Sequence, residues 1–174
     1  MPQLRASMGM VNLSLPEDPE LLEAAGRVAL AHGQLELMLR MTIKTLTGLS
    51  VDEALNATEK SKNWELRRDI IQLFNKKTND PVIRYKLKAI IGKCEQLSDE
   101  RNRLLHNAWA IGTDGSILMK GEKHAWGPAA SPESLRELAS QINVQVNVLN
   151  NERLKGFIKE VFEGSGQASA AKTS

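Results

Sequence analysis

A seven-residue repeat of apolar positions between Val82 and Ala110 constrains the fold of this chain more than any other feature. The first row of the repeat contains Leu87, Cys94 and Ala108. The neighbouring row contains Ile90, Leu97, Leu104 and Ile111. Residues at this spacing share one face of an α-helix, so the repeat predicts an amphipathic helix of seven or eight turns. Arg101 also falls on the first row, where an apolar residue is expected.

The predicted inward position of Arg101 requires partner groups. An arginine keeps its charge at any physiological pH, so burying it is costly unless carboxylates, carbonyls or a bound anion satisfy it. Glu36 lies among apolar neighbours earlier in the chain, and we expect it to be the carboxylate partner. Pairing with Glu36 alone would give Arg101 a purely structural role.

Most of the remaining chain also has helical patterning. A long first helix is expected over 16–48, with Pro19 near its start and Gly48 past its end. Residues 50–55 predict a short helical turn, and 63–77 predict a helix with Trp64, Ile70, Ile71 and Phe74 facing inward. A last helix is expected from the N-cap Ser131 to about Phe162, although 142–148 alternates as a strand would. The class predicted is all-α.

A short segment after the repeat lacks the helical pattern. Asp114-Gly115 stands between Ile111 and Ile117, and this turn sequence with short alternating flanks predicts a small β-hairpin. We expect a flexible N-terminus over 1–15, one helical domain over 16–163 and a disordered, small-residue tail over 164–174.

Composition and charge exclude several classes of protein. The single cysteine, Cys94, leaves no disulfide framework or thiolate zinc cluster, and no apolar run is long enough to span a membrane, so a cytoplasmic location is expected. Motifs for P-loop, dinucleotide and zinc-protease chemistry are missing from the sequence. His32 and Glu36 have the spacing of half a metal site, but no acidic cluster completes it, and we expect no metal and no cofactor.

The charge distribution is uneven along the chain. Residues 17–59 hold eight acids against three bases, and 60–93 hold ten bases against three acids. The basic segment is either a surface that follows a phosphate backbone or a solvated helix face. The three tryptophans are expected to pack in the protein rather than stack on bases.

The segment R-N-R-L-L-H, Arg101 to His106, is similar to the arginine, polar residue and spaced histidine of the HEPN domain family. The first helix with "GQLEL" and the run Asn107 to Trp109 after the motif add to this resemblance. The family implies an all-α bundle of four to five helices, here with the small β-hairpin after the motif helix. Many members are metal-independent ribonucleases that work as dimers, and others are non-catalytic modules.

The resemblance implies cleavage of RNA by attack of a ribose 2′-OH on the adjacent phosphorus, which leaves a 2′,3′-cyclic phosphate. His106 would transfer the proton, and Arg101 would hold the phosphate by its planar fork. Asn102 would orient the histidine or bind a sugar hydroxyl, and Arg103 and Asn107 would bind substrate. The alternative function is a non-catalytic helical module that binds RNA, a nucleotide or a protein partner.

The first helix also bears on the expected assembly. Leu30, Leu37 and Met41 form a second apolar row on the first helix, which predicts either a central bundle helix or the seam of a homodimer. A dimer would bring two motifs into one groove. The resemblance to the HEPN family also implies a toxin or phage-defence role, with an antitoxin or nucleotidyltransferase as a partner.

Overall fold

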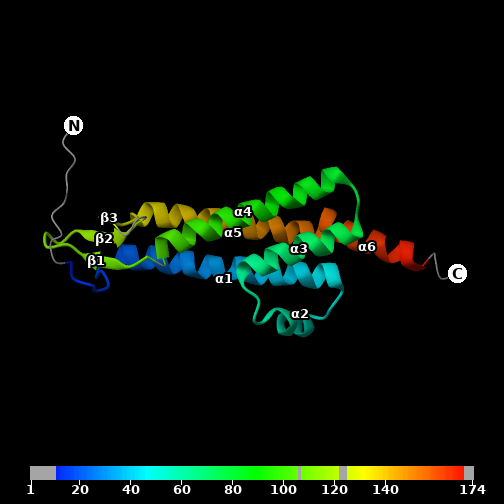
Figure 1. The fold of residues 1–174 in the computed structure, drawn as a ribbon, viewed down its shortest axis with the longest axis horizontal. Coiled ribbons are helices and arrows are strands. Elements are labelled where there is room, and N and C mark those ends of the chain that lie inside the picture. The colour runs from blue at the N-terminus through cyan, green and yellow to red at the C-terminus, as the bar shows by residue number, and fades with distance from the viewer. Residues whose placement is uncertain (1–10, 106, 122–124, 171–174) are drawn as a thin grey trace.

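The computed structural model describes residues 11–105, 107–121 and 125–170, and it shows a helical bundle with a small sheet at one end (Figure 1). The elements are α1 (Pro19–Thr47), α2 (Val51–Thr58), α3 (Asn63–Lys77), α4 (Pro81–Leu105), β1 (Trp109–Ile111), β2 (Ile117–Lys120), β3 (Trp126–Pro128), α5 (Pro132–Lys155) and α6 (Phe157–Ala170). The predicted all-α class with a hairpin after the motif helix is confirmed. Residues 142–148, which alternate like a strand, are helical within α5.

Helix α1 begins and ends where its capping residues require. The Asp18 carboxylate accepts from the backbone N–H groups of Glu20 and Leu21, and Gly48 ends the helix at φ +75°, in the left-handed region. A Cβ at Gly48 would also lie 3.2 Å from the Phe162 ring of α6. Gly48 therefore serves both the turn and the close approach of α6.

The hydrophobic core lies between α1 and the helices packed around it. Helix α1 contacts α5 along its length and also contacts α3, α4 and α6, so it is the central helix of the bundle. The largest fully buried side chains are Phe74, Leu35, Leu39, Leu46, Leu66, Ile70, Leu87, Leu97, Leu135, Ile142, Leu149 and Ile158. The prediction of a central first helix thus agrees with the packing.

Trp64 does not face the core, so its predicted inward position is wrong. Its side chain is 50% exposed, and the Arg68 guanidinium lies 5.1 Å from the ring centroid. At 100° per residue Trp64 lies roughly 120° or more around α3 from Ile70 and further from Leu66, which are both fully buried. The helix therefore places Trp64 at the edge of the bundle.

The sheet contains one strand more than the sequence predicts. Strands β1, β2 and β3 pair antiparallel in that order, with Gly115 at φ +82° in the turn between β1 and β2. Asn12 also bridges Ile111, with backbone hydrogen bonds of 3.0 and 2.9 Å in the two directions. Residues 11–15, expected to be flexible, therefore include a backbone contact to the sheet edge.

The predicted continuous helix to Phe162 is divided at Gly156. Gly156 has an extended backbone, and the Glu152 carboxylate accepts from the Phe157 N–H at 3.1 Å. A Cβ at Gly156 would lie 2.9 Å from the Glu152 Cα, so a larger residue at this break would require the backbone to shift. Helix α6 then continues to Ala170, into the tail that was expected to be disordered from Gly164.

No helix in the described part of the chain combines the length and apolar character needed to cross a membrane.

Candidate functional site

The motif residues lie at the C-terminal end of α4. Helix α4 ends at Leu105, the Asn107 amide donates to the Arg103 carbonyl at 2.6 Å, and the Trp109 indole N–H donates to the Leu104 carbonyl at 3.2 Å. These side chains satisfy carbonyls that a helix end leaves without backbone donors. The residues that follow the motif therefore fix where the helix stops.

The seven-residue row correctly predicts the helix and the burial of its first members, but its last member, Ala108, does not face the core. Leu87 and Cys94 are buried, Arg101 is half-buried, and Ala108 is exposed beyond the end of α4. The Nε atom of Arg101 is buried, while its Nη1 donates to Asn102 Oδ1 at 2.9 Å. Arg101 thus lies at the boundary between the core and the solvent.

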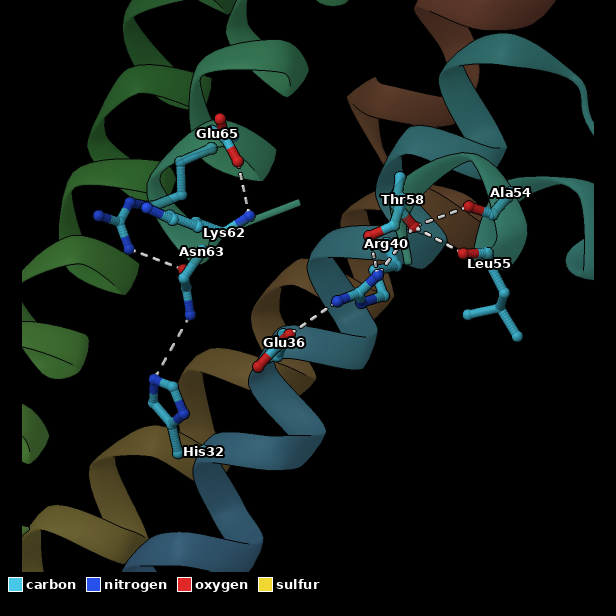
Figure 2. A network of polar contacts seen from close by, with 10 residues as sticks. His32, Glu36, Arg40, Ala54, Leu55, Thr58, Lys62, Asn63 and Glu65 are labelled. Carbon is cyan, nitrogen blue, oxygen red and sulfur yellow. Dashed lines mark hydrogen bonds and ion pairs between the residues drawn. The ribbon is translucent and has the colours of Figure 1, made fainter. Parts of the chain in front are cut away.

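Glu36 is not placed as predicted, because it pairs with Arg40. The Arg40 Nη2 lies 2.8 Å from Glu36 Oε1, one helical turn away on α1 (Figure 2). Arg40 Nη1 also donates to the backbone carbonyl and the hydroxyl of Thr58 at the end of α2. Glu36 therefore helps to hold α2 against α1.

A shallow groove lies beside the motif turn. It has a volume of about 440 Å³ and is lined by Asn102, Arg103, Asn107, Met119 and Gly121. The structure thus brings the predicted residues Asn102, Arg103 and Asn107 together and places the sheet as the opposite wall. His106 lies outside the described residues.

Arg103 at the groove takes part in a weak ion pair. The Arg103 guanidinium lies 3.7 Å from the Glu100 carboxylate, and both side chains are about half exposed. An exposed pair of this kind contributes little stability, so it leaves Arg103 available to an anionic ligand.

A second polar cluster, buried where α1, α3 and α4 meet, was missed by sequence analysis. His32 Nε2 lies 3.4 Å from Asn63 Nδ2 on α3 (Figure 2). The same nitrogen lies 3.3 Å from Ser98 Oγ on α4. His32 is 8% exposed and Ser98 is 3% exposed. This junction cluster connects three helices just before the motif turn.

Arg67 completes the junction cluster from α3. Its Nη1 donates to Asn63 Oδ1 at 2.7 Å, and its Nη2 lies 3.5 Å from the Glu95 carboxylate. Arg67 is 8% exposed and lies seven residues before the fully buried Phe74. The rule that singles out Arg101, a cation on an apolar row, would also have found Arg67.

The basic segment 60–93 does not act as one uniform surface. Arg67 is buried in the junction cluster, and Arg84 donates to the Thr78 carbonyl at 2.8 Å and the Asn75 carbonyl at 2.6 Å. Arg68 lies 3.0 Å from the Asp69 carboxylate. At least three of the bases therefore have structural partners on α3 or α4 or in the loop between them.

Within the described ranges, no three His, Cys, Asp or Glu side chains are grouped so that they could hold a metal ion. The polar residues at the groove are instead amides and guanidinium groups, which bind anions and hydroxyls.

The buried thiol of Cys94 gives a pH-dependent prediction. Burial raises the pKa of Cys94 to about 11. Because the unfolded thiol ionises near pH 9, the unfolded state binds fewer protons above that pH, and stability is lost between about pH 9 and pH 11. We expect urea unfolding to show wild type losing about 2 kcal/mol more than Cys94→Ala between about pH 8 and pH 10.5. Parallel losses in the two proteins would contradict the assignment.

Comparisons with family models, with curated protein sequences and with solved structures find no match to this chain. Its function is therefore inferred from the residues and geometry described above.

Proposed function

We propose that this protein is a HEPN-like, metal-independent endoribonuclease whose site is the groove at the end of α4. The observation that carries the proposal is the grouping of Asn102, Arg103 and Asn107 around one open groove, with the Arg101 guanidinium bonded to Asn102. Guanidinium groups bind phosphate oxygens, and amide groups bind sugar hydroxyls, so this grouping suits a phosphate and its neighbouring sugar. His106 receives its role from the motif spacing alone.

The proposed reaction needs no metal or cofactor. The ribose 2′-oxygen attacks the adjacent phosphorus while its proton passes to His106, and the bond from phosphorus to the 5′-oxygen breaks. The leaving 5′-oxygen takes up a proton, so the products carry a 2′,3′-cyclic phosphate and a 5′-hydroxyl. Arg101 stabilises the charge that develops on the phosphoryl oxygens, and Arg103 binds a neighbouring phosphate.

The test incubates purified protein with mixed RNA in EDTA. We expect cleavage by wild type that is lost in both Arg101→Ala and His106→Ala. Binding of RNA without cleavage would favour the alternative, a non-catalytic module that uses the same groove. Absence of both binding and cleavage would refute the proposal for RNA. A cytoplasmic toxin or phage-defence role, with an antitoxin or nucleotidyltransferase partner, belongs to the same proposal.

We also propose that the protein is a homodimer through the exposed face of α1 and α5, defined by Leu30, Leu37, Val144 and Val148. Leu30 is 74% exposed and Val144 is 61% exposed. Residues 140–151 of α5 carry no charged side chain, and depletion of charge marks the centre of protein interfaces. Met41, expected on the same row, is half-buried.

A glycine on this face gives a test in which one substitution should raise the stability of the protomer and weaken its dimerisation. A Cβ at Gly33 of α1 would meet nothing within 4 Å, so nothing in the described protomer requires glycine there. Gly33→Ala should stabilise the protomer by about 0.5–1 kcal/mol through helix propensity. If a partner helix packs closely on this face, the same methyl group should weaken dimerisation at least tenfold.

Sedimentation over a range of concentrations measures this effect, and Gly92→Ala is the matched control. Gly92 lies inside α4, away from the proposed face, and a Cβ added there would also meet nothing within 4 Å. It should gain similar stability without changing association. A wild-type mass of 19.2 kDa at micromolar concentration would refute the dimer, and equal dimerisation of all three proteins would refute this face as its interface.

A further inference from the structure

The junction cluster fixes which nitrogen of His32 carries a hydrogen. Because Arg67 donates to Asn63 Oδ1, the Asn63 amide presents its N–H₂ group to His32 Nε2. Nε2 must then accept, so the neutral imidazole carries its hydrogen on Nδ1. His32 is therefore an acceptor held in one orientation by α3.

The same nitrogen faces Ser98 on α4. Ser98 Oγ donates to the Cys94 carbonyl at 2.8 Å and lies 3.3 Å from His32 Nε2. The Ser98 hydroxyl hydrogen is donated to the Cys94 carbonyl, so the approach of Ser98 Oγ to Nε2 is a close polar contact and not a second hydrogen bond donated to the imidazole. His32 Nε2 thus contacts polar side chains of both α3 and α4.

Ser98 occupies the turn of α4 that precedes the groove residues. Asn102 follows it by four residues, and Arg101 follows it by three, so both lie one turn further on the same side of the helix. His32 and Ser98 are too deeply buried to reach a ligand in the groove. Any effect of His32 on the site must pass through α4.

We propose that His32 is a positioning residue, which holds the end of α4 against α1 and α3 and so fixes Arg101 and Asn102 at the groove. Its expected effect on catalysis rests on the proposed ribonuclease function. Its effect on the order of the α4 end does not depend on that function.

Hydrogen exchange of backbone amides tests the positioning role directly. In His32→Leu and Ser98→Ala, we expect protection of amides 101–105 to fall about tenfold relative to the α5 amides 138–149. His32→Gln keeps an acceptor near the position of Nε2 and should retain most of the protection. Thr42→Val is the control, because Thr42 is a buried polar residue of α1 whose hydroxyl bonds within the helix, to the Met38 carbonyl.

The outcomes separate this inference from the proposed function. Unchanged protection at 101–105, or a uniform fall over α4 and α5, would overturn the positioning role. If wild type does not cleave RNA but the local fall occurs, the ribonuclease proposal fails and the positioning role stands. If wild type cleaves RNA, His32→Leu should lower kcat at least tenfold with KM within about twofold, and an equal loss in Thr42→Val would overturn the inference.

Discussion

Replacing Arg101 by alanine is expected to lower the rate of RNA cleavage by about 10²- to 10³-fold, the loss typical of removing one group that stabilises transition-state charge. Arg101 is half-buried at the end of α4, and its Nη1 donates to Oδ1 of Asn102, which lines the groove. The loss should appear in kcat, because the added charge exists only in the transition state. Single-turnover cleavage of a short RNA measures it.

Two further arginine variants make this prediction specific. Arg101→Lys keeps the positive charge but loses the planar, two-pronged guanidinium, so its cleavage rate should lie between those of Arg101→Ala and wild type. Arg103→Ala removes an exposed arginine two residues away and should mainly raise KM, since Arg103 is assigned to a neighbouring phosphate. Equal losses in Arg101→Ala and Arg103→Ala would contradict a distinct role for Arg101.

Truncating Phe74 to alanine is expected to have the largest effect on stability, about 3–5 kcal/mol in the free energy of unfolding. Phe74 is fully buried on α3 and packs edge-to-face on Phe157 of α6, with ring centroids 5.8 Å apart and planes at 87°. Removing the ring therefore deletes core contacts and leaves a cavity between α3 and α6. Urea denaturation monitored by circular dichroism measures the loss.

Tyr85→Ala is the matched control for this core variant. Tyr85 is an aromatic residue of α4 whose side chain is exposed, so its truncation should change stability by less than about 0.5 kcal/mol. Similar losses in the two variants would mean that the aromatic contact of Phe74 with Phe157 does not stabilise the native state as described.

The fold was predictable where local chemistry decides it. Ser131 caps α5 through the Ser134 N–H at 3.2 Å, as a serine before a proline and an acid predicts. The hairpin turn at Asp114-Gly115 was predictable for the same reason. Strand β3 was not, because Trp126 to Pro128 has no alternating pattern and is defined by pairing with β2.

The candidate site was predictable only in part. The motif spacing located Arg101, Asn102, Arg103 and Asn107 at one helix end, and the structure gathers the last three around the groove. Glu36 was assigned to Arg101 from its apolar surroundings, but a partner one turn along the same helix was nearer. Charged side chains four residues apart on a helix are neighbours on its surface, so Arg40 was the nearer candidate partner.

The junction cluster shows why pattern alone was insufficient. His32 and Ser98 are 66 residues apart, and neither belongs to a motif. Their contact depends on how α1 and α4 cross, which periodicity does not determine. The break at Gly156 likewise depends on the Glu152 side chain and not on an isolated glycine signal.

The chemistry of the RNA ends tests the central claim most directly. Purified protein is incubated with a 5′-labelled RNA in EDTA, and the products are examined by mass spectrometry. The proposed mechanism predicts a 2′,3′-cyclic phosphate on the upstream fragment and a 5′-hydroxyl on the downstream fragment, with neither product formed by Arg101→Ala. Intact RNA bound to the protein, or fragments ending in a 3′-hydroxyl and a 5′-phosphate, would contradict it.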